Sequence, residues 1–406
     1  MTKRCHLLRQ GAIVGLLLLM GLGCGSDAPI QGFDFVDPNA RGSIDSTVVS
    51  DLAVEATFSD TITATGRSSN LLVGSLGGVA TQTLLRFEDV PDTVVILNAA
   101  LLLRTKGILS DGKSKSTFEA TVHPVTADWD ETTVTAETFQ DAFDPVPIAS
   151  AEILPVGSGV VGFDSTITEI VRFEFDQTGV ELVRQWADST KGPNNGILID
   201  GGSNSTFIKE FFSSVSPTNL AVLELDVLNG TERDTLSINV SQDTYLARQV
   251  AEPPPGPLYI DNVFSQQTVL KFDLSAIPRE STINRISMKL NLVRENSILA
   301  DEDFRVFMQV LFKPFEPPKR FRVDSTVTSV VFSFDASGQM LITPNSLFRL
   351  QSIFQRWINE DIENNGFILR TLTPGRDVAR VALHSTQTDP ELAPRVEIDF
   401  STAPTN

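Results

Sequence analysis

Cysteine and histidine are scarce in this chain. Its 406 residues include two cysteines, Cys5 and Cys24, and three histidines, of which His123 and His384 lie far apart. So few His and Cys side chains exclude a zinc-type cluster, and an isolated histidine is seldom a general base. There is also no glycine-rich phosphate loop followed by a lysine, and no serine nucleophile motif. We therefore expect a protein that is not an enzyme and binds no cofactor.

The apolar run near the start is too short to span a membrane. It covers residues 11–23, which is 13 residues, whereas a membrane-spanning helix needs about 20. Basic Lys3, Arg4 and Arg9 precede the run, and Cys24 follows it. This arrangement resembles a bacterial lipoprotein signal, although Gly21 stands where that pattern has leucine. The resemblance implies that residues 1–23 are removed and that Cys24 is lipidated.

A lipidated Cys24 would hold the protein on a membrane without a spanning helix, with residues 24–42 as a flexible tether. Processing before Cys24 leaves one cysteine, so the mature chain has no internal disulfide and burial must stabilise it. No aspartate directly follows Cys24, which favours the outer membrane or the cell surface. We expect an exported protein of the cell envelope.

Basic residues are outnumbered by acidic ones. The chain has 32 Lys and Arg against 51 Asp and Glu, a net charge of −19, which becomes −22 when residues 1–23 are removed. A chain with this charge repels phosphate backbones, so we exclude nucleic acid as a partner. The acidic residues are spread along the sequence, as expected for a solvated surface.

The sequence contains two copies of one unit. Several landmarks recur in the same order: Gln82–Phe87 and Gln267–Phe272, Leu71–Val73 and Leu258–Ile260, Asn194–Gly196 and Asn364–Gly366, Leu223–Val227 and Val396–Phe400. A repeat of this length indicates a duplicated domain and not a solenoid. We predict domain 1 at 43–228, a polar linker at 229–235, domain 2 at 236–401 and a tail at 402–406.

Alternation of apolar and polar residues predicts that both copies are built of strands. Apolar and polar residues mostly alternate over residues 283–292, and Gly- or Pro-containing turns separate many short runs of this kind. One segment in each copy instead has helical spacing, with Leu350, Phe354 and Trp357 in one and Val183 and Trp186 in the other. We predict an all-β protein of two tandem jelly-roll-like antiparallel β-sandwiches, each with one short helix that buries its tryptophan.

Three stretches resemble the DNRLRE domain, a bacterial and archaeal extracellular β-sandwich. They are Phe272–Pro278 with the alternating strand after it, the helix-Trp-Asn-Asn-Gly-strand segment, and Thr126–Thr135, which resembles the family's W-x-E-x-T-V-T stretch. In the second copy, residues 312–316 replace that last stretch. The family is related to carbohydrate-binding modules that include alginate binders, so the resemblance implies a module type without naming its ligand.

The acidic residues beside Trp129 are the only candidate for site chemistry. Asp128, Asp130 and Glu131 supply hard oxygen ligands, which makes them a weak calcium candidate. Two carboxylates are also what a glycosidase needs, but the second copy lacks them. Solvated acids beside a packed tryptophan remain the simplest interpretation.

Carbohydrate binding usually requires exposed aromatic side chains, and the sequence offers few. The candidates are Trp129, Tyr245 and Tyr259, together with the basic residues Arg320 and Arg322 of a proline-containing loop. We hypothesise a non-catalytic binding module that recognises a polysaccharide. The alternative is a structural or protein-interaction subunit of an envelope assembly, for which the shortage of aromatic residues speaks.

Overall fold

The computed structural model describes residues 43–59, 62–109, 116–155, 169–188, 190–202, 204–216, 220–299, 304–316, 322–335 and 337–403. The predicted signal peptide, Cys24 and the tether lie outside these residues. Ser46–Phe400 form one compact unit. The described chain ends, residues 43–45 and 401–403, belong to a second unit, in which the Thr402 amide donates to the Ser43 carbonyl oxygen at 3.1 Å.

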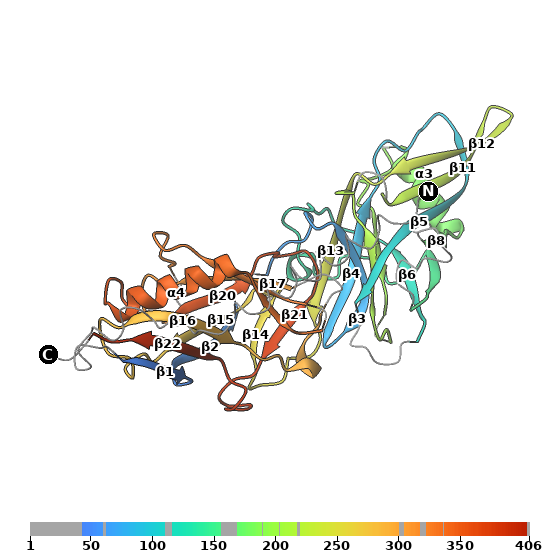
Figure 1. Ribbon diagram of the computed structural model, residues 1–406. Helices are drawn as coiled ribbons and strands as arrows, with labels where there is room; N and C mark the ends of the chain where they lie inside the picture. Colours follow the sequence, from blue (N-terminus) through green and yellow to red (C-terminus); the bar gives the residue numbers. More distant parts are fainter. Residues whose placement is uncertain are drawn as a thin grey trace, which may run out of the picture. The chain divides into compact units, whose positions relative to one another are not determined.

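The described chain is mostly β-structure in antiparallel sheets, which confirms the predicted all-β, sandwich-like fold (Figure 1). Within Ser46–Phe400 two cores are present, and we call the part around the first core lobe 1. Its strands and helices are β3 (Asn70–Leu76), β4 (Val79–Arg86), β5 (Val95–Leu109), β6 (Phe118–Pro124), α2 (Ala136–Phe139), β7 (Ala149–Ile153), β8 (Ile170–Glu174), α3 (Gln177–Trp186), β9 (Ile197–Asp200), β10 (Ile208–Phe212), β11 (Val222–Asn229), β12 (Glu232–Asn239) and β13 (Gln242–Gln249).

Lobe 2 surrounds the second core. It combines the first two strands of the chain with the C-terminal elements: β1 (Ile44–Val49), β2 (Leu52–Ser59), β14 (Leu258–Asp261), β15 (Gln266–Phe272), β16 (Thr282–Lys289), η3 (Arg294–Asn296), β17 (Phe304–Val310), β18 (Val330–Phe334), β19 (Met340–Ile342), α4 (Pro344–Ile358), β20 (Phe367–Thr371), β21 (Arg380–Leu383) and β22 (Arg395–Ser401). Its largest sheet has the order β19-β18-β17-β20-β15-β2.

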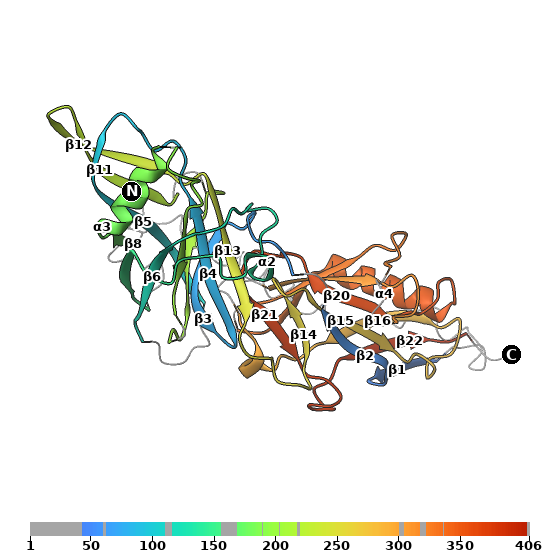
Figure 2. The same cartoon turned by 180° about the vertical axis from the view of Figure 1, so that it is seen from behind.

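Alternating side chains from facing sheets fill each core. One helix, α3 in lobe 1 and α4 in lobe 2, packs on each core (Figure 2). The Asp176 side chain caps α3 by accepting from the Gly179 amide, and Thr343 caps α4 in the same way. Trp357 of α4 is buried, as predicted, and its ring lies 4.7 Å from that of Phe367. Trp186 of α3 is only partly buried at the edge of the lobe 1 core, so the predicted burial is less complete there.

The repeated Asn-Asn-Gly motif makes the same hydrogen bonds in both lobes. The Asn194 side-chain amide donates to the Phe87 carbonyl oxygen at 2.6 Å, and Asn364 donates to that of Phe272 at 3.0 Å. In both, the side-chain oxygen of the first asparagine accepts from the glycine amide two residues later. Shared bonds at repeated positions support the predicted duplication.

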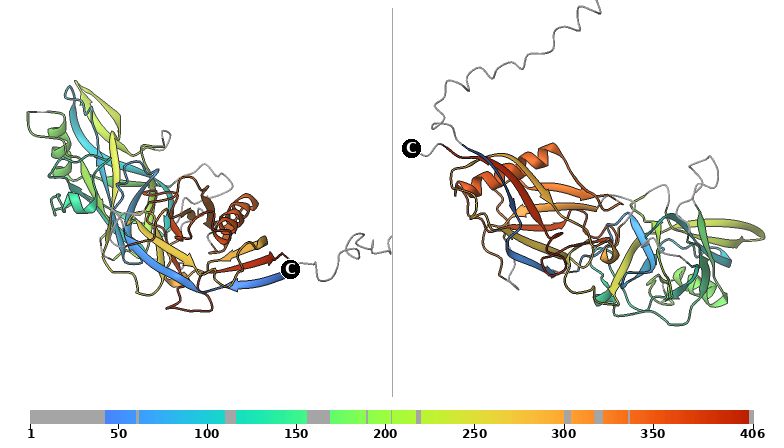
Figure 3. Two further views of the ribbon diagram at one scale, coloured as in Figure 1. Left: turned by 90° about the vertical axis from the view of Figure 1, so that its left-hand side faces the viewer. Right: turned by 60° about the horizontal axis from the view of Figure 1, so that its bottom comes forward.

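Each lobe is completed by strands whose sequence belongs to the other copy. β2 precedes lobe 1 in the chain but pairs with β15 of lobe 2, from Gln266↔Ser59 to Phe272↔Leu52. β13 follows the first copy but pairs with β4 of lobe 1, from Gln242↔Arg86 to Gln249↔Val79. In Figure 1 the blue β1 and β2 accordingly lie among the yellow to red strands of lobe 2, and Figure 3 shows β1 beside the red β22.

The predicted linker at 229–235 has a different structure. Asn229 and Glu232 are paired residues at the end of a hairpin formed by β11 and β12, and the pairing continues to Val222↔Asn239. The polar, turn-rich residues that suggested a linker are therefore the turn of this hairpin, with Gly230 at a φ of +64°. Strand pairing runs across the predicted domain limits, 43–228 and 236–401. These limits therefore stay a prediction.

Replacing the glycine of the Asn-Asn-Gly motif tests this turn. A Cβ at Gly366 would lie 2.5 Å from the Leu270 carbonyl oxygen, and φ there is +85°. We expect Gly366→Ala to lower the free energy of unfolding by about 3 kcal/mol, measured by denaturant titration. The control is Gly230→Ala, at a φ of +64° but with open space around it, which we expect to cost about 1 kcal/mol. Equal losses would contradict the steric argument.

Candidate functional site

The outward face of the large lobe 2 sheet carries a group of polar and aromatic side chains. On β17, Val306 and Met308 point into the core, so Arg305, Phe307 and Gln309 point away from it. Arg305 is exposed, and Phe307 and Gln309 are half-buried. The alternation of this strand therefore places a cation, a ring and an amide in one row.

The neighbouring strand β20 adds a second cation to this face. Arg370 is paired directly with Phe307 across the strands, and its guanidinium lies 5.5 Å from the centre of the Phe307 ring. Partial burial lowers the pKa of Arg370. Within the described residues neither Arg370 nor Arg305 forms a side-chain hydrogen bond or an ion pair. Among the described residues, these two positive charges on one sheet face therefore have no ion-pair partner.

Two glutamines flank these arginines. The register that pairs Thr268 with Leu369 brings Gln267 next to Arg370, and Gln309 is paired with Ile368. The side-chain carbonyl oxygens of Gln267 and Gln309 are buried and accept no hydrogen bond within the described structure. A buried acceptor without a donor costs free energy, so a hydroxyl or water donating there would be stabilised. We call Arg305, Phe307, Gln309, Arg370 and Gln267 the lobe 2 face.

Lobe 1 has an equivalent face with the opposite charge. Gln82 occupies the repeat position of Gln267, and it is paired with Asp200, which takes the place of Arg370. A pocket of about 250 Å³ opens here, lined by both residues and by Ser75, Leu246 and Arg248 among others. Arg248 is ion-paired with Asp141 at 2.5 Å. The two copies therefore share a scaffold but present different chemistry.

Trp129 is not an exposed platform. Its side chain is 6% exposed, its Nε1–H donates to the Asn195 carbonyl oxygen at 2.8 Å, and the Arg86 guanidinium lies 4.8 Å from its ring centre. It packs with Leu84 and Leu198 on the outward side of the lobe 1 sheet. In lobe 2, Phe315 packs on the equivalent residues, Val269 and Ile368. The prediction that Trp129 is exposed is therefore wrong, because its ring packs on its own sheet.

Tyr245 and Tyr259 are buried as well, so neither provides the exposed surface that was predicted. Tyr245 is 1% exposed and its hydroxyl donates to the Gly375 carbonyl oxygen at 3.0 Å. Tyr259 is 4% exposed and donates to Pro254 at 2.7 Å. Strand β13 places Tyr245 against lobe 2 residues, so this tyrosine joins the lobes.

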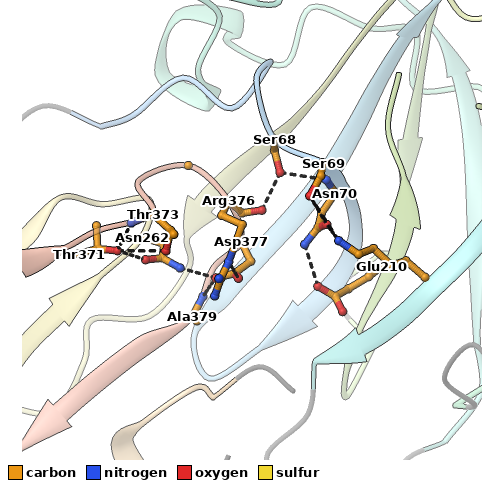
Figure 4. Close-up of polar contacts among 12 residues, drawn as sticks. Ser68, Ser69, Asn70, Glu210, Asn262, Thr371, Thr373, Arg376, Asp377 and Ala379 are labelled. Atoms are coloured by element: carbon orange, nitrogen blue, oxygen red, sulfur yellow. Dashed lines mark hydrogen bonds and ion pairs between the residues drawn. The ribbon is translucent and has the colours of Figure 1, made fainter. Parts of the chain in front are cut away.

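A network of polar side chains continues this junction (Figure 4). The Ser68 hydroxyl donates to the Arg376 carbonyl oxygen at 2.6 Å, and the Arg376 guanidinium pairs with Asp377 at 2.7 Å. Asp377 in turn accepts from the Asn262 side-chain amide at 2.5 Å and from the Ala379 backbone amide at 2.8 Å. Since Asp377 is 1% exposed, its charge stabilises the junction and is not presented to a ligand.

The three predicted calcium ligands do not converge. Asp128 pairs with Arg86 at 2.7 Å, Asp130 accepts from the Thr132 backbone amide, and Glu131 accepts from the Asp243 backbone amide at 3.1 Å. Hydrogen bonds from Thr132 lower the pKa of Asp130. In the described parts of the chain, no group of three or more His, Cys, Asp or Glu side chains is arranged to hold a metal ion.

Of the two predicted basic residues, Arg320 lies outside the described residues. Arg322 is exposed, and its guanidinium lies 5.5 Å from the ring centre of Phe312, whose side chain is 51% exposed. The sequence analysis missed Arg370 and Phe307. Strand alternation after the second Asn-Asn-Gly motif was the available signal for Arg370, since it places this residue two positions after the outward-facing Ile368.

Comparison with protein-family models, with curated proteins and with solved structures finds no match to this chain. The DNRLRE resemblance accordingly stays a prediction. Within the ranges described, none of the helices combines the length and the apolar character needed to pass through a lipid bilayer.

The buried carboxyl of Asp261 predicts a pH dependence of stability. Burial raises its pKa to about 7, opposed by backbone hydrogen bonds and by Arg380. The unfolded value is about 3.9, so the native state holds the proton more tightly. This stabilisation is fully present below about pH 4 and is lost as the pH rises through about 7. Asp261→Asn should remove about 1–3 kcal/mol of this pH-dependent loss, measured by unfolding between pH 4 and 8.

The control for that measurement is Asp273→Asn, which makes the same charge change at an exposed site where hydrogen bonds from Ser275 lower the pKa. It should leave the loss of stability between pH 4 and 8 in place. An unchanged slope in Asp261→Asn would contradict the assignment of the raised pKa to this residue.

Proposed function

We propose that this protein is an exported lipoprotein, anchored to a membrane of the cell envelope, that binds glycans with acidic groups through the lobe 2 face without catalysing a reaction. The observation that carries the proposal is Arg370, which lies over Phe307 and has no ion-pair partner among the described residues. A planar guanidinium with free donors matches a carboxylate or sulfate in two parallel hydrogen bonds.

The acidic character of the chain as a whole does not oppose this proposal. At physiological ionic strength charges are screened over about 8 Å, so a bound glycan responds mainly to the charges beside it. On the lobe 2 face these are Arg305 and Arg370. The side-chain carbonyl oxygens of Gln267 and Gln309 are buried, so recognition would rest on the arginines and the ring. A ring and two cations on one sheet face is a composition suited to a charged sugar.

A non-catalytic role is supported by where the perturbed carboxyl groups lie. Burial raises the pKa of Asp243 to about 6 and that of Asp261 to about 7. Such shifts often mark active sites. Here the two side chains are 1% and 2% exposed, and Asp243 is hydrogen-bonded to Ser214. Neither carboxyl can reach a substrate.

A structural or adhesion role is the second candidate, and the strand exchange between the lobes favours it. Because β2 completes lobe 2 and β13 completes lobe 1, the lobes cannot separate without breaking two strand pairings. A rigid pair of lobes would transmit force between a membrane anchor and a partner protein. The two roles are compatible, since a rigid support also presents a glycan-binding face.

Charge removal at Arg370 tests glycan binding. We expect Arg370→Ala to weaken retention by acidic polysaccharides in affinity electrophoresis about tenfold or more, because the carboxylate loses its bidentate partner. Neutral polysaccharides should be unaffected. The control is Arg279→Ala, which removes one positive charge from an exposed pair with Glu360 in the same lobe. Equal weakening in both variants, or no retention of the parent protein, would exclude this site.

The anchor is tested independently of the ligand. Mass spectrometry of the mature amino terminus should show a chain that begins at Cys24 and carries acyl chains. Cys24→Ser should abolish this added mass and release the protein from membranes in a fractionation experiment. A chain cut elsewhere, or one without acyl groups, would refute the lipoprotein proposal and leave the glycan proposal standing.

A further inference from the structure

Two pairs of consecutive strands, β1–β2 and β12–β13, occupy equivalent sites in the two lobes. The two strands of each pair follow one another in the chain but are hydrogen-bonded to other strands. Gln82 of β4 is paired with Leu246 of β13, and Gln267 of β15 is paired with Phe58 of β2. Gln82 and Gln267 are the same position of the repeated hexapeptide. The registers therefore coincide, and each lobe offers the same kind of sheet edge to an incoming strand pair.

The two strand pairs are held in different ways. β12 follows β11 directly through the hairpin turn at residues 230–231, so β12–β13 is continuous with the lobe that it completes. β1–β2 instead precedes lobe 1 in the chain and is held in lobe 2 by non-covalent contacts, which are the pairing with β15 and β22 and hydrogen bonds such as that from the Tyr259 amide to the Thr57 hydroxyl. Lobe 2 consists mainly of C-terminal elements, and it therefore takes two of its strands from the N-terminal part of the described chain.

The strands β1–β2 are also less deeply buried than β12–β13. β13 contains five consecutive buried residues, Asp243–Ala247, whereas β2 contains none. From β1–β2 only Val49 is a buried member of the lobe 2 core, and Leu52 packs against that core while partly exposed. Val54 and Phe58 of β2 also pack, partly buried, against a cluster on the outward side of the sheet. Releasing β1–β2 nevertheless exposes fewer fully buried side chains than releasing β12–β13 would. Opening at this place is the less costly of the two.

We propose that β1–β2 is an exchangeable element, and that a second copy of this chain can insert its own β1–β2 into lobe 2. The contacts formed would be those of the single chain, because the inserted sequence and the sheet edge are unchanged. The single-chain form and the exchanged form therefore differ only in entropy. The first loses entropy by closing one chain, and the second by associating two chains. Closure within one chain corresponds to millimolar effective concentration, so exchange between copies grows as protein concentration rises.

The geometry of insertion decides the assembly. Two copies that insert reciprocally form a closed dimer, in which every lobe is complete and no sheet edge is left open. One-way insertion leaves lobe 2 of the final copy without its strands and continues into a chain. Both products have a second copy of this protein as the partner.

Disulfide trapping between copies tests the exchange. Ala56 of β2 is paired with Val269 of β15, and directly opposed residues are close enough for a disulfide. Full-length chains carrying Cys5→Ser and Cys24→Ser are made with either Ala56→Cys or Val269→Cys. They are mixed, held a few degrees below the unfolding temperature and oxidised. We expect a disulfide-linked heterodimer whose yield rises with protein concentration.

The matched control uses the equivalent pair in lobe 1. Thr244 is paired with Leu84, so chains with Thr244→Cys and with Leu84→Cys should give at least fivefold less heterodimer, because β12–β13 is continuous with lobe 1. Thermal unfolding verifies that all four variants fold. Equal yields in the two mixtures, or no linked product from folded Ala56→Cys and Val269→Cys chains, would overturn the proposal.

A second measurement does not depend on mixed variants. In a single chain carrying both Ala56→Cys and Val269→Cys, oxidation at low concentration locks β2 on its own lobe. Native mass spectrometry of this locked chain at high concentration should show monomer only, and reduction should restore the dimer. A dimer that persists in the locked chain would place the interface elsewhere and refute the exchange.

Discussion

Strand pairing between segments that are distant in sequence holds this molecule together. The Thr57 and Thr268 hydroxyls, 211 residues apart, lie 3.4 Å from each other across β2 and β15. β13 makes the reciprocal connection to lobe 1. The described residues contain no cysteine, so backbone ladders and buried apolar side chains supply the stability of this part of the chain. Residues of both lobes also meet around Tyr245 and Asp377, and these contacts fix the junction between the lobes.

The same sheet serves different purposes on its two sides. Inward side chains of β17 and β20 fill the core, and their outward neighbours form the lobe 2 face, so a rigid scaffold positions Arg370 and Phe307. In lobe 1 the equivalent row contains Gln82 and Asp200. The two lobes thus share buried apolar positions and the turn asparagines, while their outward positions differ in charge. Such divergence would let two similar lobes bind unlike groups.

The sequence predicted much of the fold because its signals were local. Alternation located the strands, the Leu350–Phe354–Trp357 spacing located α4, and the Asn-Asn-Gly motifs located matching turns. Two features depended on tertiary contacts and were missed. Glu232 looked like part of a linker, although it pairs with Asn229. Trp129, Tyr245 and Tyr259 were named as exposed candidates because the two helix tryptophans were assigned to the core, whereas each of these three rings is buried.

The pairing of β1 with β22 has a consequence for how the chain is made. Lobe 1 has all of its strands once synthesis reaches Gln249, but lobe 2 needs both the first and the last strands. The earliest β-segment to emerge must remain unpaired until translation is almost complete, with its ladder groups open to other chains. Strand pairing between such distant segments forms slowly, because the two ends of the chain must meet before the ladder can form.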